Sequence, residues 1–254
     1  MKPRFTSGHA TPKRRGVLFH CFKSLQWALT FAVLIFLLVQ LWFFGWLLWW
    51  KWTPPQETHF MSIRLAELRE QNPDARLDYQ WVDYNQISDN LKRALIAAED
   101  ARFVDHEGFD WDGIQVALQK NQKTGHFVAG GSTISQQLAK NLFLNPHRSM
   151  LRKGQEALIT LMIEALWDKE RIFECYLNVI EWGNGVFGAE AASRHYYRVS
   201  ANQLSTWQAA RLAAMAPNPR YYDTHRKASG LARKTAIIHS RMGAAQLPVQ
   251  RTED

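Results

Sequence analysis

One acidic stretch of the sequence has the residue types needed for proton transfer. AAEDARFVDHEGFD, residues 97–110, sets Glu99 beside Asp100 where an apolar run ends. Glu99 closes a helix predicted over residues 88–99, next to its apolar stripe, and partial burial there raises the pKa of a carboxyl and suits it to act as a base. The alternative is a solvated pair at a helix end. Asp110 is expected to cap the next helix, and His106 to be a hydrogen-bonded structural histidine.

A second stretch, GGSTISQQLAKNLFL at residues 130–144, begins a helix whose start could receive an anion. Thr133 and Gln136 have the spacing of a capping box, and a polar, Gly-rich run precedes them. The exposed N–H groups and the dipole of a helix start favour negative charge. An ordinary mobile loop is the alternative. A broad polar face of the predicted helix carries Thr133, Gln136, Gln137, Lys140 and Asn141.

Two further stretches complete the set of candidates. In RKGQE, residues 152–156, Arg152 and Glu156 are four residues apart and share one helix face, with Lys153 adjacent. Taken alone, this pattern is typical of a surface ion pair. LNVIEWGNGVFGAEAA, residues 177–192, has three glycines within six residues and predicts a tight backbone turn.

The elements that must position these residues are mostly helices. Strand signals are scarce, and the best is a short run near residues 77–82. Apolar periodicity and capping residues predict helices over residues 60–71, 88–99, 111–123, 133–144, 149–166, 168–178, 186–194, 203–215 and 226–241.

The N-terminal part of the chain predicts a membrane anchor. Residues 24–50 contain no charged side chain, and this run is longer than the roughly 20 residues that a helix needs to cross a bilayer. Six cations and no acid precede it, so the positive-inside rule places the N-terminus in the cytoplasm and the body outside. The formal net charge of +8 comes mostly from this short block, which argues against nucleic acid as a partner.

This reading divides the chain into five parts. Cys21 and Cys175 fall on opposite sides of the predicted membrane and therefore cannot pair. The predicted parts are a basic cytoplasmic tail at 1–23, a transmembrane helix at 24–50, a linker at 51–59, a main helical domain at 60–245 and a C-terminal tail at 246–254.

Taken in chain order, the candidate stretches resemble the signature blocks of the peptidoglycan glycosyltransferases, glycosyltransferase family 51. The resemblance spans about residues 80 to 222, and long blocks in fixed order at matching separations make it specific. The blocks are EDARFVDHEG, GGSTISQQLAKN, RKGQE, ERIFECYLNVIEWGNGVFGAEAA and RLAAMAPNPRYY.

The resemblance implies polymerisation of lipid II into β-1,4-linked glycan strands, by inverting displacement, with release of undecaprenyl pyrophosphate. It gives Glu99 the removal of the proton from the acceptor's 4-hydroxyl, and Glu156 the orientation of nearby cations or help with departure of the leaving group. No organic cofactor is expected, and a divalent cation, Mg²⁺ or Mn²⁺, could share the charge of the pyrophosphate. The substrate-binding residues implied are Asp100, Ser132, Thr133, Gln137, Lys140, Asn141, Arg152 and Lys153.

The fold implied is a two-lobed, lysozyme-like α-helical domain with a membrane-facing part, set in the inner membrane by a single span. Periodicity alone predicts only a mostly helical chain. The partners implied are lipid II, the lipid-linked glycan chain, the membrane, and proteins of cell division or elongation. No S-x-x-K occurs in the sequence, so we expect no transpeptidase activity. A membrane-anchored lytic transglycosylase or lysozyme-like hydrolase and a non-catalytic scaffold for wall synthesis remain alternatives.

Overall fold

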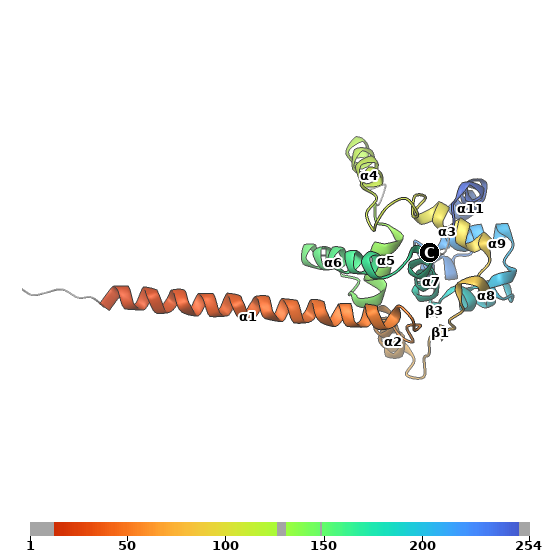
Figure 1. Ribbon diagram of the computed structural model, residues 1–254. Helices are drawn as coiled ribbons and strands as arrows, with labels where there is room; N and C mark the ends of the chain where they lie inside the picture. The colour runs from red at the N-terminus through yellow and green to blue at the C-terminus, as the bar shows by residue number, and fades with distance from the viewer. Residues whose placement is uncertain (1–12, 126–130, 148, 249–254) are drawn as a thin grey trace, which may run out of the picture. The chain divides into compact units, whose positions relative to one another are not determined.

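The computed structural model describes residues 13–125, 131–147 and 149–248. Two compact units make up the chain, Met1–Gly45 and Trp46–Asp254. The first unit consists of most of helix α1 (Lys13–Trp50), drawn in orange in Figure 1. Its segment Phe22–Trp50 is long and apolar enough to cross a membrane, with a mean hydropathy of 2.4. The predicted apolar run is therefore one continuous helix, as a membrane anchor requires.

The second unit is mostly helical, as the sequence predicts. Three short 3₁₀ turns, η1 (Tyr84–Gln86), η2 (Ala201–Gln203) and η3 (Met242–Ala244), connect parts of it. Its helices are α2 (His59–Gln71), α3 (Asp89–Glu99), α4 (Trp111–Thr124), α5 (Ile134–Phe143), α6 (Met150–Leu166), α7 (Lys169–Val179), α8 (Ala189–Tyr197), α9 (Thr206–Met215), α10 (Pro219–Thr224) and α11 (Ser229–Arg241).

Short polar side chains fix the starts of the helices that carry the site. The hydroxyl of Ser88 accepts the N–H of Leu91 at the start of α3, and Ser149 does the same for Arg152 in α6. At α5 the predicted capping box is present, since Thr133 and Gln136 each accept the other's backbone N–H. Such caps satisfy N–H groups that a helix start leaves without partners, typically contributing about 1 kcal/mol each.

A small sheet corrects one predicted helix. Strands β1 (Asp78–Tyr79), β2 (Glu181–Gly183) and β3 (Val186–Phe187) lie in the order β1-β3-β2, with β1 parallel and β2 antiparallel to β3. The helix predicted from residue 186 begins only at Ala189. Gly188 has φ +85°, and a Cβ there would lie 2.8 Å from the Asn178 carbonyl oxygen. This backbone turn ends the strand before the helix can start.

Helices α5, α6 and α7 form the support of the site. Helix α5 packs against both of the others, and the ribbon shows the three together in the green part of the chain (Figure 1). Leu138, Ile159 and Phe173, one from each helix, are fully buried. Burial of one such side chain contributes about 1.5 to 3 kcal/mol, so this core holds the polar faces of the helices in a fixed relation.

The last turn of α1 belongs to the second unit. Leu47 is fully buried, and its carbonyl accepts the indole N–H of Trp167 at 2.8 Å. The carbonyl of Trp50 accepts the Arg171 guanidinium at 2.6 Å, and the Trp50 ring lies 5.3 Å from that of Phe143. The chain thus enters the helical unit before the predicted linker begins, and α2 starts at the linker's end. The predicted domain boundaries stay predictions, and residues 1–12 and 249–254 lie outside the described residues.

Candidate active site

A cavity of about 800 Å³ collects most of the residues that the sequence singled out. Its walls come from α2, α5, α6 and α7 and from residues 216–220, which follow α9. The predicted site residues that line it are Ser132, Gln137, Lys140, Asn141, Arg152, Lys153 and Glu156. Glu99, Asp100 and Thr133 do not line the cavity.

Glu156 holds two cations at the cavity wall. Its carboxylate is almost fully buried and accepts Arg152 Nη1 at 2.6 Å, while Lys153 Nζ binds the other oxygen. The Lys153 ammonium also lies 3.4 Å from Ser132 Oγ. Arg152 Nε is buried with no hydrogen-bond partner among the described residues. The predicted surface ion pair is therefore a cluster of three side chains around a buried carboxylate, and Glu156 holds both cations in place.

Lys140 brings a third cation to the same cavity from α5. Burial lowers the pKa of this ammonium, and the carboxylate of Glu156 acts in the opposite direction. A partly dehydrated ammonium has lost favourable interactions with water. An anion in the cavity would compensate for this loss by pairing with the ammonium. Together the three cations can receive a doubly charged phosphate group.

Glu99 stands in a different environment, at the end of α3. Its Oε2 accepts the Gln137 amide N–H at 2.9 Å, and Gln137 itself lines the cavity. Burial raises the pKa of Glu99, and the hydrogen bond from Gln137 and the charge of Lys140 oppose this shift. Within the described parts of the chain Glu99 has no ion pair. A partly buried carboxylate without a paired cation is suited to accept a proton.

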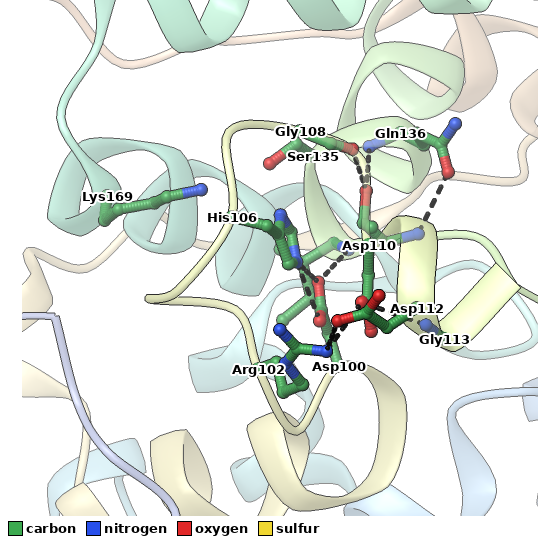
Figure 2. Close-up of polar contacts among 12 residues, drawn as sticks. Asp100, Arg102, His106, Gly108, Asp110, Asp112, Gly113, Ser135, Gln136 and Lys169 are labelled. Carbon is green, nitrogen blue, oxygen red and sulfur yellow. Dashed lines mark hydrogen bonds and ion pairs between the residues drawn. The ribbon is translucent and has the colours of Figure 1, made fainter. Parts of the chain in front are cut away.

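Asp100, which lies beside His106 in Figure 2, and Thr133 tie the acidic loop to the start of α5. The Asp100 carboxylate accepts the Ile134 N–H at 3.0 Å and lies 3.0 Å from His106 Nε2. The Thr133 hydroxyl donates to the Gly108 carbonyl at 2.7 Å. Both side chains are buried and already engaged, which makes them supports of the local geometry. Their substrate-binding role stays a prediction. The predicted cap by Asp110 is present, and His106 is hydrogen-bonded to Asp100, as expected for a structural histidine.

The described residues hold no ready-made cluster of metal ligands. In residues 13–125, 131–147 and 149–248, no group of three or more His, Cys, Asp or Glu side chains is placed to hold a metal. Glu156 is taken up by Arg152 and Lys153, and Asp100 by His106 and the Ile134 N–H. The expected Mg²⁺ or Mn²⁺ stays a prediction, since such an ion can be held largely by waters and substrate phosphates, and the proposed mechanism does not depend on it.

Sequence reasoning missed several residues of the cavity. Tyr176 lies in the fourth block and Arg220 in the fifth, so the blocks pointed to the right segments but not to these side chains. Phe60 had no signal beyond its place in a predicted helix. The other lining residues not predicted are Pro146, Ser149, Met150, Ile180, Glu181, Ala216, Pro217, Asn218 and Pro219.

Comparison with known proteins agrees with this geometry. The family model described as Transglycosylase matches residues 66–243, which include every residue of the cavity wall except Phe60. The chain belongs to the transglycosylase family. Membership in this family confirms the resemblance inferred from the five blocks.

Relatives within the transglycosylase family match nearly their whole length. A biosynthetic peptidoglycan transglycosylase of Dechloromonas aromatica is 70% identical over 214 residues, which cover 84% of this chain and 93% of that protein. The proteins of the same name from Laribacter hongkongensis and Methylobacillus flagellatus are 64% and 61% identical. The alignments cover 84% and 89% of this chain and 94% and 99% of those relatives.

Proposed function

We propose that the chain is a peptidoglycan glycosyltransferase that polymerises lipid II into β-1,4-linked glycan strands and releases undecaprenyl pyrophosphate. The observation that carries the proposal is a cavity in which three of the lining cations lie near a partly buried carboxylate that has no ion pair among the described residues. Lys140, Arg152 and Lys153 line it, and Gln137 connects it to Glu99. A pyrophosphate leaving group needs cations to stabilise its charge, and an acceptor hydroxyl needs a base to take its proton, so both kinds of side chain must lie close together.

The reaction is a single inverting displacement. The acceptor's 4-hydroxyl oxygen forms a bond to C1 of the donor's reducing-end sugar, and the proton of that hydroxyl passes to Glu99. The bond from C1 to the phosphate oxygen breaks, and its electron pair leaves with the pyrophosphate. Arg152 offers a fork of N–H donors to the developing charge, and Lys140 and Lys153 act as point charges. Glu156 keeps Arg152 and Lys153 in place and forms no bond to substrate.

A membrane site fits lipid-borne substrates. We infer a single span with the N-terminus in the cytoplasm and the catalytic unit on the outer side of the inner membrane, since the N-terminal cations precede the apolar helix. Large apolar side chains that α4 and α6 leave exposed support a membrane-facing surface. They are Trp111, Val116, Leu118, Met150, Leu151, Leu158 and Leu161. Division or elongation proteins remain predicted partners.

The test is conversion of lipid II by the detergent-purified full chain. We expect labelled lipid II to become a polymer that a muramidase digests. The hydrolase alternative predicts shortening of added soluble glycan without new polymer, and the scaffold alternative predicts no turnover of either substrate. Either result would contradict the proposal.

A further inference from the structure

Tyr176 is a buried polar residue of the cavity that the reaction above does not use. It lies on α7, is 1% exposed, and its ring packs against Phe173. Its hydroxyl donates to Gln137 Oε1 at 2.9 Å, across 39 residues of sequence. The same Gln137 donates through Nε2 to Glu99 Oε2, also at 2.9 Å. Three side chains from α7, α5 and α3 therefore form one line of hydrogen bonds that ends on the proposed base.

The chemistry of an amide makes this line directional. Gln137 has one carbonyl oxygen and one NH₂ group, and the two point in opposite directions. While Tyr176 donates to the oxygen, the NH₂ must face Glu99. A flipped amide would set its oxygen against the carboxylate oxygen, and the NH₂ would face a hydroxyl that has lost its acceptor. The Tyr176 hydroxyl thus selects the orientation in which Gln137 stabilises ionised Glu99.

The surrounding charges show why that orientation matters. Burial raises the pKa of Glu99 and so favours the protonated form, which cannot act as a base. Asp100, next in the chain, raises the pKa further, while Gln137 and Lys140 from α5 lower it. Burial also raises the pKa of Tyr176 well above its ordinary value, so its hydroxyl keeps its proton and remains a donor.

We propose that Tyr176 is a positioning residue for catalysis, which acts through Gln137 to keep Glu99 ionised and ready to take the acceptor's proton. The inference rests on the proposed function, because it gives Glu99 its role as base. It adds a residue of the fourth block to the machinery without giving it contact with the reacting atoms.

Tyr176→Phe in the full-length chain tests the proposal, since it removes only the hydroxyl. We expect kcat/KM for lipid II to fall about tenfold near neutral pH, the size of one lost hydrogen bond. The acid limb of the pH profile should move to higher pH, because Gln137 is then free to turn away. Tyr79→Phe is the matched control, since Tyr79 donates to the Pro55 carbonyl at 2.6 Å and does not line the cavity. Its pH profile should equal that of wild type.

A double-mutant cycle separates positioning from general support of the fold. In a Gln137→Ala background, Tyr176→Phe should cause no further loss, because the residue through which it acts is already gone. Full additivity, an unchanged Tyr176→Phe enzyme, or a slower enzyme with an unmoved acid limb would each overturn the proposal. The proposed function fails separately, if Glu99→Gln still polymerises lipid II at near the wild-type rate.

Discussion

At the scale of single residues, two glutamates of the site have opposite surroundings. Glu156 is clamped by Arg152 and Lys153, while Glu99 meets only the amide of Gln137 and the more distant charge of Lys140. Paired cations stabilise a carboxylate in its charged form, and burial without a pair favours the neutral form. In the proposed mechanism, the same functional group therefore holds cations at one position and acts as a base at the other.

The raised pKa of Glu99 predicts a link between activity and stability. A carboxyl whose pKa is higher in the folded state binds more protons there, so stability falls as pH rises from its ordinary pKa through the folded pKa. Glu99→Gln removes the ionisation and should unfold a few degrees higher at neutral pH. Thermal unfolding of both proteins at acid and neutral pH measures this. A lower midpoint for Glu99→Gln at neutral pH would show that the carboxylate is stabilised by its site.

Glu156→Gln should have the reverse effect on stability. It leaves the half-buried Arg152 without a charged partner, and breaking such a pair costs about 3 kcal/mol, at the low end of the usual range because the Lys153 side chain is 42% exposed. Chemical denaturation gives the free energy of unfolding. Glu107→Gln, in the acidic loop and outside any ion pair that the structure describes, is the control and should change it little. Equal stability of both variants would mean that the cluster is not held by Glu156.

At the scale of elements, α5 is the platform on which the site is assembled. Its start is fixed by Thr133, Gln136 and Asp100, and its next two turns present Gln137 and Lys140. Displacement of this helix start would move the partner of the base and a cation together. The positions of Gln137 and Lys140 in the site therefore depend on the contacts that hold the start of α5.

Thr133 tests whether this segment is structural. Thr133→Ala removes the cap and the bond to the Gly108 carbonyl, and should cost about 1 to 2 kcal/mol of stability. Thr133→Ser keeps the hydroxyl and should recover most of it. If Thr133 also binds substrate, as the resemblance implies, KM for lipid II should rise in Thr133→Ala. Denaturation and initial-rate measurements on the same samples distinguish a support from a substrate ligand.

The sequence predicted most elements because their signals are local. Each capping side chain accepts a backbone N–H only three residues later, so the sequence alone predicts the helix start. These residues are Ser88, Asp110, Thr133 and Ser149. Strand β3 escaped prediction because it is only two residues long and one of its two partners, Asp78 in β1, lies 108 residues earlier. The contact of Tyr176 with Gln137 is likewise tertiary. Prediction of the site residues also relied on the resemblance, since each short motif alone has an ordinary structural explanation.

At the scale of the whole molecule, the boundary between the two units falls within helix α1, after Gly45. The last residues of α1, from Trp46 on, count with the second unit, where Leu47 and Trp50 are buried. Truncations at two points test this arrangement. A chain of residues 46–254 should keep its unfolding midpoint, whereas one of residues 53–254 loses two buried side chains, worth about 3 to 6 kcal/mol. Equal midpoints would contradict the packing of this turn.

The anchor itself should matter for lipid-borne substrates. On liposomes containing lipid II, we expect the 46–254 chain to polymerise more slowly than the full chain, because the membrane no longer concentrates it beside its substrates. In detergent, where both substrate and enzyme are dispersed, the difference should shrink. Equal rates on liposomes would show that tethering is dispensable.

The measurement that tests the central claim most directly compares chemistry and binding in Glu99→Gln. If Glu99 takes the acceptor's proton while Lys140 and Arg152 hold the donor pyrophosphate, Glu99→Gln should lose about 10²- to 10⁴-fold in lipid II polymerisation yet bind a lipid pyrophosphate like wild type. Lys140→Ala and Arg152→Ala should weaken that binding as well, by about 1.5 to 3 kcal/mol each. A folded Glu99→Gln protein that polymerises lipid II at near the wild-type rate would contradict the account.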